Sequence, residues 1–236
     1  MSHNGIPRAV LFDVGMTLIH PIGRVMVEEL AAVGVNSVSP ERAASAWAAA
    51  AESHHIDFPR GATRSDKAGA TWATLLGVRR DAGRAAWIAA AARPDLFTEL
   101  DQHAIQVLRY LRACDIRVAA VSNSNGTLDE ELTAFGLAEY FDITIDSTIV
   151  GTEKPDRDIF TTALTQVGGD PTQMWFVGDG LINDMFGAAV AGVGRLVLYD
   201  RHRVYRTPLP VTVIHTLGEL GSLIADALEG ETPCVS

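Results

Sequence analysis

Short runs of apolar residues recur along the chain, and each ends at a turn signal or a polar residue. A run of this kind is typical of a strand that is buried on both faces of a parallel sheet. The runs cover residues 9–12, 118–121, 143–145, 174–177, 196–198 and 211–214. We therefore expect six buried strands.

Apolar residues at helical spacing separate most of these runs. Residues 104–111 and 159–167 each place apolar side chains on one helix face. Thr127 and Glu130 form a capping-box pair that predicts the start of another helix, which Gly136 would end. Strands that alternate with helices favour an α/β fold with a doubly wound, Rossmann-like parallel sheet.

Residues 24–93 differ from the rest because they are rich in alanine and contain no convincing strand. Ser39 and Pro40 predict one helix start, Ser65 predicts a second helix that ends at Gly77, and a third helix would end before Pro94. We expect an inserted all-α helical domain at residues 19–95, and a core made of residues 1–18 and 96–236. The inserted domain's tryptophans are expected to form its own packing.

Composition narrows the classes of partner. The formal net charge of -10 argues against a nucleic-acid ligand, because such binders present a basic face. No stretch approaches the roughly 20 apolar residues that span a bilayer, so we expect no membrane partner. The two cysteines have no metal-ligand spacing and suggest no disulfide framework, which favours a cytoplasmic location. A homodimer is left open.

Polar residues follow several of the expected strands. Asp13, Ser122 and Asp179 come at strand ends, while Lys154 and Asp184 lie in segments just beyond strands. Ligands of parallel α/β sheets bind at the carboxyl ends of the strands, so these residues should converge in one crevice. Lys154 is one of only two lysines in the chain.

Four segments around these residues resemble the four motifs of the haloacid dehalogenase (HAD) superfamily hydrolases, in the family's order. They are AVLFDVGMTL, AAVSNSNG, GTEKPDRDIF and FVGDGLIND. The helical block between the first two segments resembles the cap of the subfamily that inserts it there. The resemblance covers nearly the whole chain.

The resemblance implies a phosphatase that forms an aspartyl-phosphate on Asp13. It implies Mg²⁺ as cofactor, held by the Asp13 and Asp179 carboxylates and the Gly15 carbonyl, with Asp184 supporting the metal or orienting Lys154. The Lys154 ammonium would neutralise the nucleophile and the phosphate together.

Four residues are expected at the substrate, a small anionic phosphorylated metabolite. Ser122 would hydrogen-bond a phosphoryl oxygen, assisted by the backbone amide of Asn123. Thr17 lies near the nucleophile, where it either contacts substrate or stabilises the turn. His20 follows the first motif at the expected hinge between core and cap.

Gly15 departs from the family's pattern. Phosphatases of this family usually carry a second aspartate there, which protonates the leaving oxygen and then activates water. Such acid-base assistance is worth roughly a hundredfold to ten-thousandfold in rate. The enzyme could use substrates with good leaving groups, or take a proton from His20 or from the cap residues His54, His55 and Asp57, or have lost catalysis.

Three alternative functions remain open on sequence alone. A 2-haloacid dehalogenase also lacks the second aspartate, but its chemistry needs no metal, and the acidic pair Asp179 and Asp184 weighs against it. A phosphonate hydrolase also tolerates a non-acidic residue at the position of Gly15. Its chemistry is expected to need a lysine in the cap, for which Lys67 is the candidate. A non-catalytic module that binds phosphate is the third.

Overall fold

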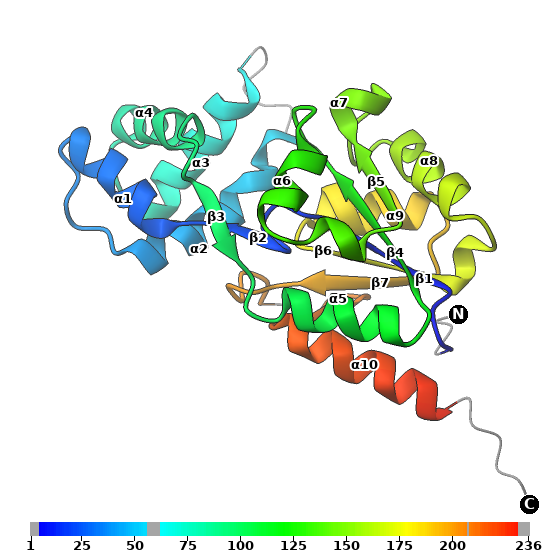
Figure 1. The fold of residues 1–236 in the computed structure, drawn as a ribbon. Coiled ribbons are helices and arrows are strands. Elements are labelled where there is room, and N and C mark those ends of the chain that lie inside the picture. Colours follow the sequence, from blue (N-terminus) through cyan, green and yellow to red (C-terminus); the bar gives the residue numbers. More distant parts are fainter. Residues whose placement is uncertain (1–4, 56–61, 207, 231–236) are drawn as a thin grey trace, which may run out of the picture. The chain divides into compact units, whose positions relative to one another are not determined.

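A parallel sheet of six strands runs through the computed structural model, which describes residues 5–55, 62–206 and 208–230 (Figure 1). In sheet order the strands are β5 (Ile143–Asp146), β4 (Arg117–Ser122), β1 (Ala9–Phe12), β6 (Met174–Gly178), β7 (Arg195–Tyr199) and β8 (Thr212–Ile214). All six strands expected from the apolar runs are confirmed, as is the doubly wound α/β class. Chain order reverses across β1, so the sheet's crevice lies beside this strand.

Helices cover both faces of this sheet. They are α5 (Ala104–Ala113), α6 (Leu128–Ala134), α7 (Ser147–Val150), α8 (Arg157–Val167), α9 (Gly187–Val190) and α10 (Leu217–Gly230). Successive strand residues face opposite sides, so Leu11 and Phe176 pack with the α8 side chains Ile159 and Phe160 in one buried cluster. Helix α5 packs against β4 and beside α10 on the other face (Figure 1).

The chain divides into two compact units, with breaks after Leu18 and between Glu99 and Leu100. The break after Leu18 coincides with the expected limit, whereas the second lies beyond residue 95. Two strands that the sequence did not predict, β2 (Ile19–Pro21) and β3 (Phe97–Leu100), pair in a small sheet of their own. Neither strand shows a long apolar run. The two pair only because segments far apart in sequence meet in space, which a local pattern does not reveal.

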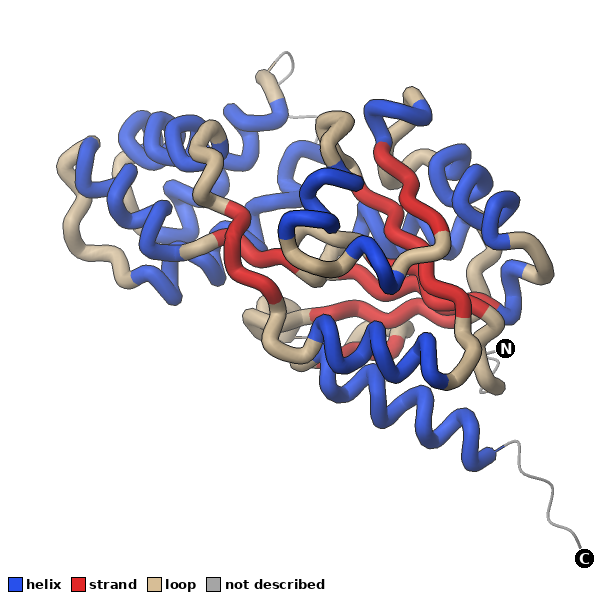
Figure 2. The backbone as a smooth tube through the Cα atoms, in the orientation of Figure 1, coloured by secondary structure: helices blue, strands red, loops and turns tan. Residues whose placement is uncertain are grey.

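The second unit is helical apart from this strand pair (Figure 2). Its α-helices are α1 (Gly23–Ala32), α2 (Pro40–Ala51), α3 (Arg64–Leu76) and α4 (Arg80–Ala91). Trp47 stacks on Trp87 with ring centroids 3.5 Å apart, and Trp72 meets both rings edge-on. All three rings are buried, as expected for packing residues. Small residues let the helices approach: a Cβ on Gly83 of α4 would lie 2.4 Å from Cβ of Ala73.

One predicted helix start was wrong, and another was right but lacked its predicted cap, because α6 does begin after Thr127. Helix α3 begins after Thr63, not Ser65, because Thr63 and Asp66 form a reciprocal capping box. The expected box at Thr127 does not form, since the Thr127 hydroxyl donates to Asn125 Oδ1 instead. The amide of Leu128 in the first turn of α6 donates to Asp146 Oδ2 from β5. A tertiary contact therefore replaced the local cap.

No helix among the described residues is both long and apolar enough to cross a membrane.

Changing Trp72 to Ala should destabilise the protein by about 3–5 kcal/mol, because it removes a fully buried ring and its hydrogen bond to the Ala43 carbonyl. Urea unfolding followed by circular dichroism measures the change. Leu75→Ala on the same helix is the control, since Leu75 is 47% exposed and should cost less than about 1 kcal/mol. Equal losses in both variants would contradict a tryptophan-centred core.

Candidate active site

Asp13 lies at the carboxyl end of β1, in the middle of the sheet. Its amide donates to the Val177 carbonyl of β6 at 2.9 Å, which extends the strand pairing to the site. The chain then turns sharply, with the amide of Leu18 donating to the Val14 carbonyl and Met16 in the left-handed region at φ +66°. After this turn, Asp13 is buried at the sheet edge, with its side chain 9% exposed.

Both oxygens of Asp13 have a donor. Lys154 Nζ lies 2.5 Å from Asp13 Oδ1, and Thr17 Oγ1 donates to Oδ2 at 3.3 Å. Thr17 has no exposed surface, and its hydroxyl contacts the Asp13 carboxylate; its predicted part at the substrate or in the turn stays a prediction. The carboxylate is thereby held in one orientation.

Lys154 bridges two buried carboxylates. Its ammonium also lies 2.7 Å from Asp184 Oδ1, and the side chain is almost completely buried. Burial alone would lower the pKa of Lys154, but the charges of Asp13 and Asp184 outweigh it and raise that pKa above its ordinary value. The two carboxylates therefore favour the protonated form of Lys154.

Asp184 is positioned by backbone as well as by Lys154. Gly180 N donates to Asp184 Oδ2 at 2.8 Å, and Asp184 lies in a π-helical turn over Leu181–Phe186. Burial raises the pKa of the Asp184 carboxyl, and the charge of Lys154 opposes this rise. Position 178 must be glycine for this arrangement, because a Cβ there would lie 2.4 Å from Asp184 Oδ2.

Asp13, Asp179 and Asp184 form an acidic cluster. One oxygen from each carboxylate lies within 4.8 Å of the other two. Hard carboxylate oxygens at this spacing are the donors that Mg²⁺ and Ca²⁺ prefer, so the residues fit a divalent cation. Gly15, whose carbonyl was expected to join them, lies two residues after Asp13 in the same turn.

Ser122 ends β4, the strand beside β1, and is buried at 6% exposure. The next residue, Asn123, has a role that the sequence did not suggest. Its side-chain amide donates to the Lys154 carbonyl at 3.0 Å, and its Oδ1 accepts from the Lys154 amide at 2.7 Å. This reciprocal pair fastens the backbone of Lys154 to the end of β4.

Asp146 is a second residue that sequence reasoning missed. It ends β5 opposite Ser122, and its buried carboxylate accepts from the amides of Gly126, Leu128 and Thr148. The loop that follows Ser122 is therefore held by the neighbouring strand. The signal was present, because Asp146 follows an apolar run just as Asp13 does.

The structure thus gathers Asp13, Thr17, Lys154, Asp179 and Asp184 in the first unit, with Ser122 and Asn123 on the adjacent strand end. His20 belongs to the second unit, where it is buried on β2. Its predicted contact with substrate stays a prediction.

The cap candidates also lie in the second unit. The rings of His54 and His55 lie with centroids 4.0 Å apart and planes tilted by 40°, and Asp57 lies outside the described residues. Lys67 Nζ lies 3.5 Å from the His54 carbonyl.

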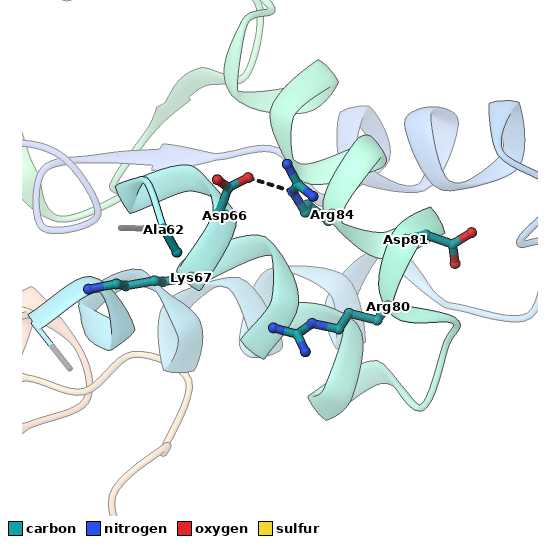
Figure 3. Close-up of a pocket in the computed structure, with 6 residues that line it drawn as sticks. All are labelled: Ala62, Asp66, Lys67, Arg80, Asp81 and Arg84. Atoms are coloured by element: carbon teal, nitrogen blue, oxygen red, sulfur yellow. Dashed lines mark hydrogen bonds and ion pairs between the residues drawn. The ribbon is translucent and has the colours of Figure 1, made fainter. Parts of the chain in front are cut away.

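A pocket of about 490 Å³ lies in the second unit, lined mainly by charged side chains (Figure 3). The lining residues are Ala62, Asp66, Lys67, Arg80, Asp81 and Arg84. Asp66 pairs with Arg84, and Asp81 pairs with Arg79. Figure 3 shows the Lys67 ammonium and the Arg80 guanidinium well apart. The charges of this pocket therefore do not converge on one ligand group.

A parallel sheet carries a buried carboxylate, a lysine and an acidic cluster at its carboxyl edge, where α/β proteins bind their ligands. A sequence profile described as haloacid dehalogenase-like hydrolase matches residues 7–192. This chain therefore belongs to the haloacid dehalogenase-like hydrolases, and the resemblance expected from its motifs is confirmed.

Individual relatives agree with this family. The chain is 29% identical to human "Haloacid dehalogenase-like hydrolase domain-containing protein 3" over 99% of both chains. It is 31% identical to the Escherichia coli (strain K12) "Pyrimidine 5'-nucleotidase YjjG" over 65% of this chain and 68% of that protein. A crystal structure of an Ehrlichia chaffeensis HAD-superfamily hydrolase has the same fold, with a TM-score of 0.62, 24% identity and coverage of 95% of this chain and 98% of that one.

Changing Lys154 to Met should destabilise the metal-free protein by about 3–5 kcal/mol, because Asp13 and Asp184 would remain buried without their counter-charge. Urea unfolding in the presence of a chelator measures this cost. Lys67→Met, at the only other lysine, is the control and should change stability by less than about 1 kcal/mol. If the two variants unfold alike, Lys154 does not stabilise the site by charge.

Proposed function

We propose that this protein is a Mg²⁺-dependent phosphatase of small phosphorylated metabolites, acting through an aspartyl-phosphate on Asp13. The observation that carries the proposal is the acidic cluster at the nucleophile, with the Lys154 ammonium bonded to two of its members. An isolated buried carboxylate would repel a phosphate dianion. Here the donor set fits a divalent cation, which Asp13, Asp179 and the Gly15 carbonyl would hold and which would neutralise charge for the approaching phosphoryl group.

The residues of the chain then have distinct tasks. Asp13 attacks phosphorus, the ester P–O bond breaks, and the alcohol oxygen leaves with its electron pair. Water then attacks the phosphorus of the aspartyl-phosphate, which releases inorganic phosphate and restores the carboxylate. Lys154 balances charge throughout, and Thr17 keeps Asp13 oriented. Ser122 and the backbone amide of Asn123 are assigned to the phosphoryl oxygens.

Gly15 determines which leaving groups are favoured. Without a carboxyl group at this position, an alkoxide has no adjacent proton donor in the first unit's turn, whereas an aryl or acyl phosphate leaves without one. His20 remains the hinge residue proposed as a substitute acid.

The names of relatives support the substrate class. One relative is a pyrimidine 5'-nucleotidase, and others are named glyceraldehyde 3-phosphate phosphatase and phosphoserine phosphatase. Each name describes the hydrolysis of a phosphate ester on a small molecule. The helical second unit is proposed as the cap, and a cytoplasmic location and a homodimer stay predictions.

Hydrolysis of p-nitrophenyl phosphate should require Mg²⁺ and should fall by more than about a thousandfold in Asp13→Asn, because the amide is not a nucleophile. The release of nitrophenol with and without a chelator measures both effects. Asp129→Asn, on the exposed side of α6, is the control and should retain activity. Halide release from a 2-haloacid without metal would instead favour dehalogenation, and binding of phosphate without any hydrolysis would favour a binding module.

Changing Gly15 to Asp should raise the turnover of alkyl phosphates about tenfold or more, because it supplies the absent acid. Gly15 is not among the glycines with a positive φ, so its backbone angle does not exclude an aspartate. The ratio of alkyl to aryl phosphate turnover is the measurement. Gly15→Asn is the matched control, since asparagine has the shape of aspartate but no carboxyl proton to donate. An equal ratio in both variants would show that leaving-group protonation does not limit this enzyme.

A further inference from the structure

The loop of residues 201–206 leaves the sheet beside the acidic cluster. Strand β7 ends at Tyr199 and pairs in parallel with β6, with Leu198 opposite Gly178 (Figure 1). Neighbouring strands lie about 4.8 Å apart, so this loop begins one strand away from Asp179 and two strands away from Asp13. It opens on the same carboxyl edge of the sheet as the site.

Buried Asp200 holds this loop in a defined conformation. Its carboxylate accepts from the amides of Val204 at 2.7 Å and Tyr205 at 3.1 Å. Its carbonyl accepts from the Arg203 amide and contacts His215 Nδ1 at 2.8 Å. Arg203 is held in the left-handed region at φ +52°, which costs energy for a residue with a side chain. A solvated connection would not need this anchoring.

The loop is strongly basic in an acidic protein. Its sequence, RHRVYR, has three arginines and a histidine and no acidic residue, although the chain carries a net charge of -10. Arg201 and His202 have contacts of their own. The side chains of Arg203 and Arg206 are exposed, and neither makes an ion pair within the described part of the chain. Two cationic groups are therefore available to a ligand.

Charge balance at the site shows what such cations could bind. The three carboxylates of the cluster exceed the single Lys154 ammonium by two negative charges, which a divalent cation would just offset. A phosphoryl dianion then meets a site of no net charge, and nothing there compensates a further negative group on the substrate. Any second anionic group would need cations just outside the cluster, where the 201–206 loop lies.

We propose that the 201–206 loop binds a second anionic group, a carboxylate or another phosphate, on the alcohol part of the substrate, through Arg203 and Arg206. This proposal rests on the proposed function and specifies its substrate class: phosphate esters of small organic acids or bisphosphates. The loop sets selectivity and takes no part in the transfer of the phosphoryl group.

The test compares phosphoglycolate with ethyl phosphate, which lacks the carboxylate. The measured quantity is the ratio of their kcat/KM values, with 1,3-propanediol bisphosphate against propyl phosphate as the pair for a second phosphate. In the double variant Arg203→Ala/Arg206→Ala the ratio should fall about fivefold for at least one pair, because exposed ion pairs contribute little each; this fall corresponds to about 1 kcal/mol in total. High salt should lower the wild-type ratio as well, because it screens exposed charges.

Arg109→Ala is the matched control. Arg109 is an exposed arginine on α5, away from the carboxyl edge, so the ratio should stay at the wild-type value. Wild-type ratios in the double variant for both pairs, or an equal fall in the control, would overturn the proposal.

A failed phosphatase assay can be told apart from a failed loop proposal. If the wild type cleaves neither these four phosphates nor p-nitrophenyl phosphate, the proposed function fails. If it cleaves p-nitrophenyl phosphate alone, the function stands. In both cases calorimetric binding of phosphoglycolate then decides on the loop. Weaker binding by the double variant than by Arg109→Ala would support the loop as an anion site. Equal binding by the two variants would refute it.

Discussion

The ammonium of Lys154 between the carboxylates of Asp13 and Asp184 is the interaction on which the site depends. All three groups are buried, and desolvation of so many charges is tolerated only when each is paired and hydrogen-bonded. The surrounding backbone completes the hydrogen bonding, because the Gly180 amide donates to the second oxygen of Asp184. The absence of a side chain at Gly178 leaves room for that carboxylate. The charge pattern and the local backbone are thus parts of one arrangement.

Two polar side chains away from the reacting groups keep the loops in register. Asn123 fastens the backbone of Lys154 to the end of β4, and Asp146 fastens the loop after β4 to β5. Both use charged or amide oxygens to satisfy backbone amides that no strand or helix could satisfy. The loops at the carboxyl edge are therefore positioned by the neighbouring strands, which is how a parallel sheet supports a precise site. Gly15 differs from these residues, because it brings no side-chain functional group to the turn that it occupies.

The second unit has a core of its own. Its tryptophans pack against one another, and small residues let its helices approach closely. In the proposed function, this unit and surface loops such as 201–206 would set the choice of substrate, while the residues at the carboxyl edge of the sheet carry out the hydrolysis.

Local patterns in the sequence determined the strands of the sheet, most helices and the residues at the strand ends. Apolar runs need no distant partner to be recognised, and parallel strands must bring Asp13, Ser122 and Asp179 to one edge. Three features were decided only by tertiary structure. They are the pairing of β2 with β3, the hydrogen bond from Leu128 at the start of α6 to Asp146, and the hydrogen bonds between Asn123 and the backbone of Lys154. Each of them joins segments separated by many residues, and single-chain periodicity contains no information about which distant groups will meet. The sequence therefore specified which charges the site contains, and the packed fold decided which donor each charge receives.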